Sequence, residues 1–196
     1  MSDDVSLEIY NIKEHYDKFW HKWDFKNSNR FKNFPLLIDM IGKIKPNSIM
    51  EIGCGGGANL KLIQKFYPDI KLNGIDISDT AIEITKKNVD GDFFVSDARF
   101  LKTSYDLVLT VHSLEQMKYI LKDVIFNISK ITDKILLFEP FFCLQNIFGK
   151  WHCIRSEYVQ GIPFYVRDSG FDILEFKKTN RGNFLSKTGM LYGVKK

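Results

Sequence analysis

A run of glycines between residues 53 and 57 is the strongest chemical signal in the chain. Gly53-Cys-Gly-Gly-Gly57 follows a short apolar stretch, 48–52, and precedes a stretch whose apolar residues have helical spacing. Glycines at such a turn let the backbone adopt positive φ and approach a ligand closely. The spacing also fits the Gly-x-Gly-x-x-Gly/Ala pattern, with Ala58 at the last position, so the loop is typical of a nucleotide site.

Three acidic residues stand where the predicted strands end. Glu51 lies two residues before Gly53, Asp76 ends the second strand and Asp97 ends the third. Asp76 follows the glycines by about 20 residues, which suits an acceptor for ribose hydroxyls. Each acid alone could be a helix cap or the partner of a lysine. In register with a glycine loop, the three together indicate a nucleoside site.

A nicotinamide dinucleotide is one alternative for this loop. Against it, Glu51 stands where a dinucleotide fold normally packs an apolar residue, and a carboxylate there can organise the loop and lie near a cation. Asp97 is a further acid, placed to accept from an adenine amino group. With 196 residues, we also expect no room for the second domain of a dehydrogenase.

Strand and helix patterns alternate through the middle of the chain. Strands are expected at 48–52, 70–77, 93–95, 105–111 and 134–138, with two more near 171–177 and 189–194. Helices are expected at 5–23, 34–43, 58–67, 78–88 and 116–130, followed by a less regular segment up to 156 and a broken helix over 156–169. Such alternation predicts a mainly parallel sheet with ligands at the carboxyl ends of its strands.

Several motifs, in the same order, resemble those of class I S-adenosylmethionine (SAM)-dependent methyltransferases. Segments 51–57, 74–78 and 96–98 are similar to the first three motifs of that family. Residues 105–108 resemble its fourth strand. Residues 156–158 and 168–171 resemble its last helix and its sixth strand. The resemblance covers roughly residues 45–178. It implies an α/β fold, a doubly wound, mainly parallel seven-stranded sheet whose last strand is antiparallel, plus an N-terminal helical lid.

The resemblance also implies a role for each residue of the first three motifs. Glu51 and the backbone of the loop, including Gly53, Cys54 and Gly55, would hold the methionine part of SAM. Asp76 would bind both ribose hydroxyls. The residues that would contact the adenine are Ile77 on its face, and Asp97 with the Ala98 backbone on its edge.

Two aromatic segments are candidates for the walls of the site. In the N-terminal segment, Tyr16 and Trp20 are candidate SAM contacts, and Arg30 is a candidate partner for the SAM carboxylate. A helix simply packed on the sheet explains this segment equally well. Residues 141–158 form the other candidate wall, where His152, Arg155 and Tyr158 could bind a polar or anionic acceptor; a loop packed for stability is the alternative there.

His112 is the candidate catalytic base. A hydroxyl or ammonium acceptor must lose a proton during methyl transfer, and a positioned His or carboxylate usually accepts it. His112 follows the fourth strand, although it could instead contact only cofactor or backbone. Glu115 is predicted to anchor the turn, and Glu139 either faces the pocket or belongs to a turn. Many family members carry a His where Gln116 stands, so no role of that His is transferred.

Composition limits the class of protein. Apolar residues make up 44% and the net charge is +4, which is too weak to argue for a nucleic-acid partner. The three cysteines lack CxxC spacing, which argues against a disulfide framework or metal site. No apolar run reaches the roughly 18 residues of a membrane span. We therefore expect a cytoplasmic protein without a membrane partner, forming one domain with a lid (1–44), a SAM-binding core (45–140) and an acceptor-side segment (141–196).

The leading functional hypothesis is a methyltransferase that acts on an oxygen or nitrogen of a small molecule, in bacterial metabolite, sugar or surface-polysaccharide biosynthesis. S-adenosylhomocysteine (SAH) would be the spent cofactor. The alternatives are an RNA or protein methyltransferase, a non-catalytic SAM-binding subunit and a nicotinamide oxidoreductase. Against a methyltransferase of exocyclic base amines, no Asp-Pro-Pro-Tyr type sequence follows the fourth strand, where 110–113 reads Thr-Val-His-Ser.

Overall fold

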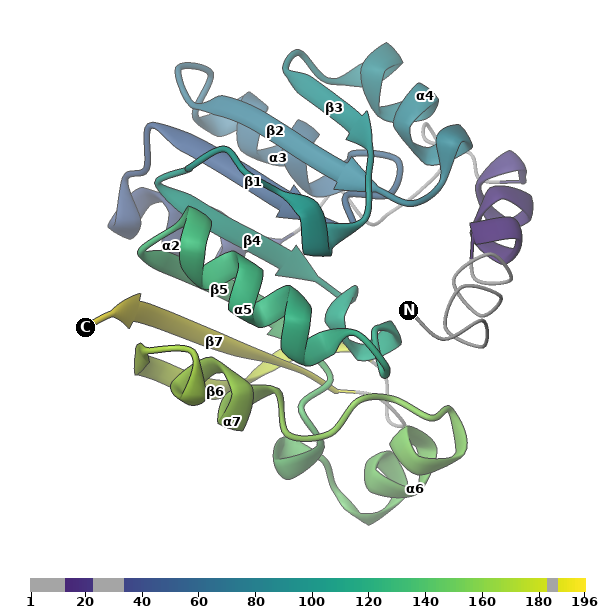
Figure 1. Ribbon diagram of the computed structural model, residues 1–196, viewed down its shortest axis with the longest axis vertical. Coiled ribbons are helices and arrows are strands. Elements are labelled where there is room, and N and C mark those ends of the chain that lie inside the picture. The colour runs from purple at the N-terminus through teal and green to yellow at the C-terminus, as the bar shows by residue number, and fades with distance from the viewer. Residues whose placement is uncertain (1–12, 23–33, 183–186) are drawn as a thin grey trace. The chain divides into compact units, whose positions relative to one another are not determined.

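The structure is a computed structural model that describes residues 13–22, 34–182 and 187–196, apart from the side chains of 181 and 182 (Figure 1). The chain divides into two compact units, Met1–Asp97 and Ala98–Lys196. In the part of the chain that is described, no helix combines the length and the apolar character needed to cross a membrane.

The N-terminal unit alternates helices with parallel strands. Residues 13–21 are helical, and we call them the N-terminal helix. The elements that follow are α2 (Pro35–Ile44), β1 (Ser48–Ile52), α3 (Ala58–Phe66), β2 (Lys71–Asp76), α4 (Asp79–Asn88) and β3 (Asp92–Val95). β2 pairs in parallel with both β1 and β3, which gives the order β3-β2-β1. Their carboxyl ends therefore lie at one edge, where the sequence predicted the three acids.

The C-terminal unit contains the antiparallel part of the sheet. Its elements are η2 (Ala98–Phe100), β4 (Leu107–Val111), η3 (Leu114–Gln116), α5 (Leu121–Ile131), β5 (Lys134–Glu139), η4 (Phe142–Leu144), α6 (Ile147–Arg155), α7 (Ile162–Asp168), β6 (Phe171–Gly182) and β7 (Lys187–Lys195). β4 and β5 are parallel, and β7 runs antiparallel to both β5 and β6, in the order β4-β5-β7-β6.

The strands of the two units make up a seven-stranded sheet, and one strand, β7, is antiparallel to its neighbours. This confirms the expected fold class. Buried strands supply much of the core: the side chains of β4 from Leu107 to Thr110 are buried, as are those of β5 from Ile135 to Glu139. A near-continuous apolar run was the basis for predicting the first of these strands.

Three expectations about the C-terminal half were wrong in detail. The fifth α-helix begins at Leu121 rather than near residue 116, because 114–116 form a separate 3-10 turn. The segment expected to be irregular contains α6, whose N-cap Asn146 accepts a hydrogen bond from the Gly149 N–H at 2.7 Å. Gly161 does not interrupt a helix; it caps the start of α7, with a proline in the first turn.

Ser78 begins α4 as predicted. Its hydroxyl accepts a hydrogen bond from the Ala81 N–H at 3.1 Å and also contacts the Asp17 carboxylate of the N-terminal helix. This cap holds the start of α4 directly after Asp76, at the end of β2.

The substitution Ser78→Ala should lower the free energy of unfolding by about 1 kcal/mol, because it removes the acceptor of a helix N-cap. Thermal unfolding of the two purified proteins measures the difference, with an expected drop in Tm of a few degrees. Thr103→Ala, at an exposed position, is the matched control and should stay within about 0.5 kcal/mol of the wild type. Equal Tm values for Ser78→Ala and the control would contradict the capping role.

Candidate active site

The glycine loop turns sharply between β1 and α3. Gly53, Gly55 and Gly57 have φ values of 69°, 53° and 78°, in the left-handed region that favours glycine. A Cβ at Gly55 would lie 2.4 Å from the Trp20 ring, so a side chain at this position would displace the N-terminal helix. Glycine is therefore favoured in this loop by the positive φ angles, and at Gly55 also by the close Trp20 ring, which leaves no space for a side chain.

The N–H groups of this loop are largely bonded within the protein. Those of Gly53 and Cys54 both donate to the Ile75 carbonyl, at 2.8 and 2.9 Å. Gly55 donates to the Asp76 carboxylate at 2.9 Å, and Gly57 donates to the Cys54 carbonyl at 3.0 Å. A pyrophosphate binds through free N–H groups at a helix N-terminus. Four donors of this loop already have acceptors, and two acids flank it, so the site suits a cation better than a dinucleotide phosphate.

Glu51 carries a buried carboxyl group beside the loop. Its side chain is fully buried, and its Oε1 accepts a hydrogen bond from Asn59 Nδ2 at 2.7 Å. Its other oxygen, Oε2, is buried without a hydrogen-bond partner among the described residues. Burial raises the pKa of Glu51 to about 8, and the nearby Asp76 charge adds to this effect. An ammonium group of a ligand would pair with the free oxygen and compensate for its burial.

Asp76 is held by the backbone on both of its oxygens. Gly55 N–H donates to Oδ2 at 2.9 Å and Ser78 N–H donates to Oδ1 at 3.0 Å. Burial raises the pKa of Asp76, while these backbone bonds oppose the rise. A carboxylate oxygen accepts more than one hydrogen bond, so each oxygen keeps capacity for a further donor. Two free acceptor positions on one carboxylate are compatible with the two vicinal hydroxyls of a ribose.

The other residues predicted to contact the nucleoside follow the same strand ends. Ile77 is half-buried directly after Asp76, and Asp97 is half-buried two residues beyond β3. The Ser96 N–H donates to the Asp76 carbonyl at 3.0 Å, which ties the end of β3 to the end of β2. Ala98 is buried, and its carbonyl accepts from Asn127 Nδ2 at 3.0 Å.

The N-terminal helix packs on the start of α4. Asp17 contacts the Ser78 hydroxyl and accepts from the Thr80 N–H at 3.4 Å, and Lys13 pairs with Asp79. Trp20 from the same helix is buried against Gly55. Tyr16 is half-buried and packs edge-on against His15. The structure thus brings Trp20 to the glycine loop, whereas Arg30 lies outside the described residues.

Cys54 contributes to the loop through its backbone N–H and carbonyl groups rather than through a reactive thiol. Its side chain is buried, and burial raises the pKa of its thiol well above the usual range. The thiol therefore stays protonated and unreactive near neutral pH.

In the C-terminal unit, His112 stands at the end of β4 in an unusual backbone conformation. Its φ is 53°, which is uncommon for a residue other than glycine and often marks a functional site. The ring lies between two partners, with Nδ1 3.2 Å from Glu115 Oε1 and Nε2 2.7 Å from Thr188 Oγ1. The imidazole is exposed, whereas Glu115 and Thr188 are buried. A carboxylate on one ring nitrogen and access to solvent are features of a general base.

Glu139 organises the turn that carries His112. It is fully buried at the end of β5, and its Oε1 accepts from Thr110 Oγ1 at 2.7 Å. The same oxygen accepts from the N–H groups of Ser113 and Leu114, at 3.3 and 3.2 Å. Burial and the neighbouring Glu115 raise the pKa of Glu139 well above its usual range. Sequence reasoning placed Glu139 at a strand end but missed Thr188, because the hydrogen bond from Thr188 to His112 spans 76 residues.

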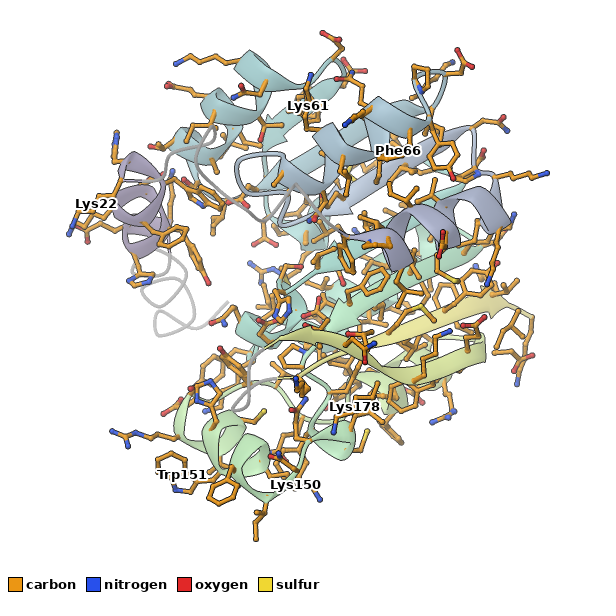
Figure 2. All side chains as sticks on the ribbon, turned by 180° about the vertical axis from the view of Figure 1, so that it is seen from behind. Lys22, Lys61, Phe66, Lys150, Trp151 and Lys178 are labelled. Atoms are coloured by element: carbon orange, nitrogen blue, oxygen red, sulfur yellow. The ribbon has the colours of Figure 1, made fainter. Side chains whose placement is uncertain are left out.

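The residues predicted to bind the acceptor lie on and after α6. His152 packs edge-on against Tyr158, with ring centroids 5.7 Å apart, and both are half-buried. Arg155 is exposed and lies over the Trp151 ring at 5.3 Å. Trp151 and Lys150 lie on the outer side of α6 (Figure 2). His152 and Tyr158 therefore form a pair that does not include Arg155.

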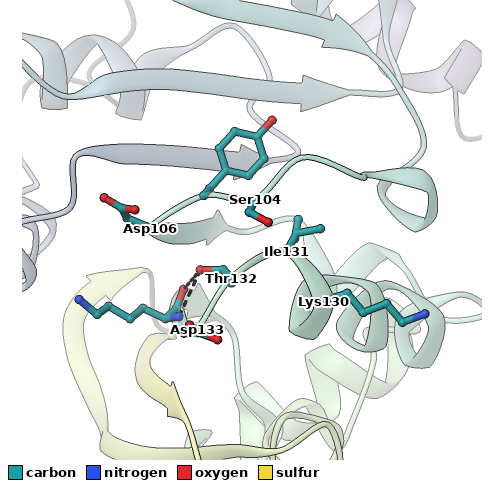
Figure 3. A pocket seen from close by; sticks show the side chains of 8 residues that line it. Ser104, Asp106, Lys130, Ile131, Thr132 and Asp133 are labelled. Carbon is teal, nitrogen blue, oxygen red and sulfur yellow. Dashed lines mark hydrogen bonds between the residues drawn. The ribbon is translucent and has the colours of Figure 1, made fainter.

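A polar cavity of about 410 Å³ lies elsewhere in the C-terminal unit (Figure 3). Its lining comes from the segment before β4 and from the segment that joins α5 to β5. The lining residues are Ser104, Tyr105, Asp106, Lys130, Ile131, Thr132, Asp133 and Lys134. Ligands of parallel sheets bind at the opposite, carboxyl ends of the strands. None of the predicted site residues lines this cavity.

The residues of the N-terminal unit fit SAM. The unpaired, buried Oε2 of Glu51 is available to the methionine ammonium group, and Asp76 to the ribose hydroxyls. Glu51 and Asp76 thus place carboxyl oxygens beside the loop, which agrees with the positive charge of an ammonium.

Comparison with known proteins leads to the same cofactor. The family model of the methyltransferase domain matches residues 26–171. A demethylmenaquinone methyltransferase of Thermotoga maritima is 26% identical over 104 residues, which are 47% of this chain and 44% of that protein. A ribosomal protein L11 methyltransferase of Dictyoglomus turgidum is 24% identical over 153 residues, 73% of this chain and 45% of that protein. The chain thus spans less than half the length of these curated relatives.

Solved structures show the same fold. The magnesium protoporphyrin IX methyltransferase of Synechocystis, crystallised with SAH, superposes with a TM-score of 0.72 at 15% identity, covering 95% of this chain and 99% of that one. The family match extends over most of the chain, and the sheet and the motifs agree with it. The chain therefore belongs to the class I SAM-dependent methyltransferases.

Proposed function

We propose that this chain transfers the methyl group of SAM to an oxygen or nitrogen of a small molecule. The observation that carries the proposal is the buried, unpaired oxygen of Glu51 beside a glycine loop in which the N–H groups of Gly53, Cys54, Gly55 and Gly57 are bonded within the protein. Two of the similar proteins are named for small acceptors, a demethylated quinone and a porphyrin. An acceptor from bacterial metabolite, sugar or surface-polysaccharide biosynthesis is consistent with these names.

In this mechanism, Glu51 binds the ammonium of the methionine part and Asp76 binds the ribose. Trp20 covers the glycine loop and excludes water from it. SAM, when bound, supplies an electrophilic methyl group on its sulfonium sulfur. The chain then has to hold the acceptor in line and remove its proton.

His112 accepts that proton at Nε2, once the acceptor hydroxyl or ammonium replaces the Thr188 hydroxyl as the partner of this nitrogen. Glu115 holds the proton on Nδ1 and stabilises the ring when it becomes positively charged. Glu139 keeps the turn in place through its bonds to the Ser113 and Leu114 N–H groups. His112 is thus the proposed catalytic residue, and Glu115 and Glu139 are positioning residues.

A protein acceptor is the second candidate, because one relative is named a ribosomal protein L11 methyltransferase. Incubation with methyl-labelled SAM and cell extract separates the two: size fractionation after the reaction shows whether label enters small molecules, protein or RNA. We expect the label in the small-molecule fraction. Label confined to protein or RNA would overturn the small-molecule proposal, and SAH binding without any transfer would favour a non-catalytic subunit.

Asp76→Ala should weaken SAH binding by at least about 100-fold, because a charged acceptor of two hydrogen bonds is lost from a buried site. Calorimetric titration with SAH measures this. Asp69→Ala, at an exposed position before β2, is the control and should bind like the wild type. Undiminished binding by Asp76→Ala, with circular dichroism showing the fold intact, would remove Asp76 from the site.

SAH binding should release a proton at pH 7, because of Glu51. In the free protein the pKa of Glu51 is about 8, so the group is mostly protonated. The ammonium of the ligand favours the carboxylate and lowers this pKa, so affinity rises as the pH increases towards about 8. Titrations in buffers of different ionisation enthalpy measure the release. Glu51→Gln should abolish the proton release that Glu51 contributes. Glu83→Gln, at an exposed position on α4, should release as many protons as the wild type. Equal proton release by the wild type and both variants would contradict this prediction.

His112→Ala should spare SAH binding and lower kcat by about 100-fold, the usual contribution of a general base. Glu115→Gln should lower kcat less and change the pH profile, because an amide orients the imidazole but does not stabilise its charged form. Steady-state rates between pH 6 and 9 separate these effects. Unchanged turnover in His112→Ala would remove this residue as the base.

A further inference from the structure

Helix α6 exposes an apolar face to solvent. Its large apolar side chains are exposed to an unusual degree: Ile147 by 78%, Ile154 by 59%, and Phe148 and Trp151 by 55% each. Ile147, Trp151 and Ile154 stand at i, i+4 and i+7, which places them on one stripe of a helix. We call these four residues the α6 apolar face. A patch of this kind on a protein surface marks an interaction site.

The opposite side of α6 packs on its own unit. Gly149 and Cys153 are its buried residues, and they lie four apart on one side of the helix. Cys153 Sγ lies 3.9 Å from the Pro140 carbonyl, which anchors the helix to the end of β5. The helix is therefore held through its small residues, with its largest apolar side chains turned outward.

The charged residues of α6 are all basic. Lys150, His152 and Arg155 flank the apolar face, and the nine-residue helix contains no Asp or Glu. Lys150 Nζ lies 5.6 Å from the Phe142 ring and the Arg155 guanidinium lies 5.3 Å from the Trp151 ring. The first acid after the helix, Glu157, pairs with Lys118 at 2.9 Å, so its charge is compensated.

We propose that α6 docks this chain on an anionic lipid surface. The exposed side of α6 presents Trp, Phe and Ile side chains with basic residues beside them and no acids, which complements the apolar and the anionic parts of such a surface. The Lys150 ammonium and the Arg155 guanidinium lie over the Phe142 and Trp151 rings, so positive charge lies beside exposed aromatic surface and can pair with lipid phosphates.

This inference goes beyond methyl transfer and does not depend on it. From the sequence we expected no membrane partner, because no segment is long and apolar enough to span a bilayer. Docking through α6 needs no span. The sequence predicts residues 141–158 as a wall of the site, and only the structure separates the buried side of this helix from its exposed side.

Co-sedimentation of the purified full chain with vesicles tests the proposal. The vesicles are pure phosphatidylcholine, or phosphatidylcholine with phosphatidylglycerol as the anionic lipid. We expect binding to the anionic vesicles, at least about tenfold weaker binding to the neutral ones, and loss of binding at high salt. Trp151→Ser and Ile147→Ser should each weaken binding about tenfold, since each removes a large apolar group. Lys150→Glu should weaken binding to anionic vesicles only.

Phe66→Ser and Leu174→Ser are the matched controls, because Phe66 and Leu174 are large apolar residues exposed by 53% and 61% outside α6. Both should bind vesicles like the wild type. SAH titration and circular dichroism confirm that every variant is folded. Absence of wild-type binding, or equal binding by Trp151→Ser, would overturn the proposal. A second result would also overturn it. If no variant binds vesicles and sedimentation velocity shows that Ile147→Ser converts an oligomer into a monomer, the partner of the α6 apolar face is a second copy of the chain.

Discussion

The burial of the Glu51 carboxyl group is the constraint around which the N-terminal unit is arranged. A carboxyl oxygen without a hydrogen bond is costly inside a protein, and Asn59 satisfies only one of the two oxygens of Glu51. In the neighbouring loop, the N–H groups of Gly53, Cys54 and Gly55 are bonded elsewhere, so none of these three donates to Glu51. A cationic group that reaches this oxygen would compensate for its burial.

The two units carry different parts of the chemistry and use the same structural device. In each, polar groups follow parallel strands at their carboxyl ends, where a carboxyl group accepts backbone N–H bonds and so holds the next turn. Asp76 does this for the glycine loop and for α4, and Glu139 does it for the turn after His112. The first arrangement presents carboxyl oxygens beside the glycine loop, and the second presents an imidazole. Loops held in this way allow a family to keep its cofactor while its acceptor changes.

Local patterns predicted most of the fold and pointed to the residues that we propose hold the cofactor. The apolar run of β1, the Ser78 cap and the glycine loop each depend on a few neighbouring residues, so they can be read from the sequence. The partners of His112 could not, because Thr188 comes from a distant strand. The helix α6 escaped prediction for a different reason: its apolar stripe faces solvent, so its pattern did not resemble that of a helix packed through its apolar side. The contact of Trp20 with Gly55 likewise joins segments that sequence spacing does not connect.

Calorimetric titration of the purified chain with SAH and, separately, with NADH tests the central claim most directly. The buried, unpaired oxygen of Glu51, beside a loop in which four N–H groups are already bonded, predicts saturable binding of SAH at one site and no heat with NADH. Binding of NADH without binding of SAH would contradict the assignment of the cofactor and, with it, the account of Glu51 and the glycine loop.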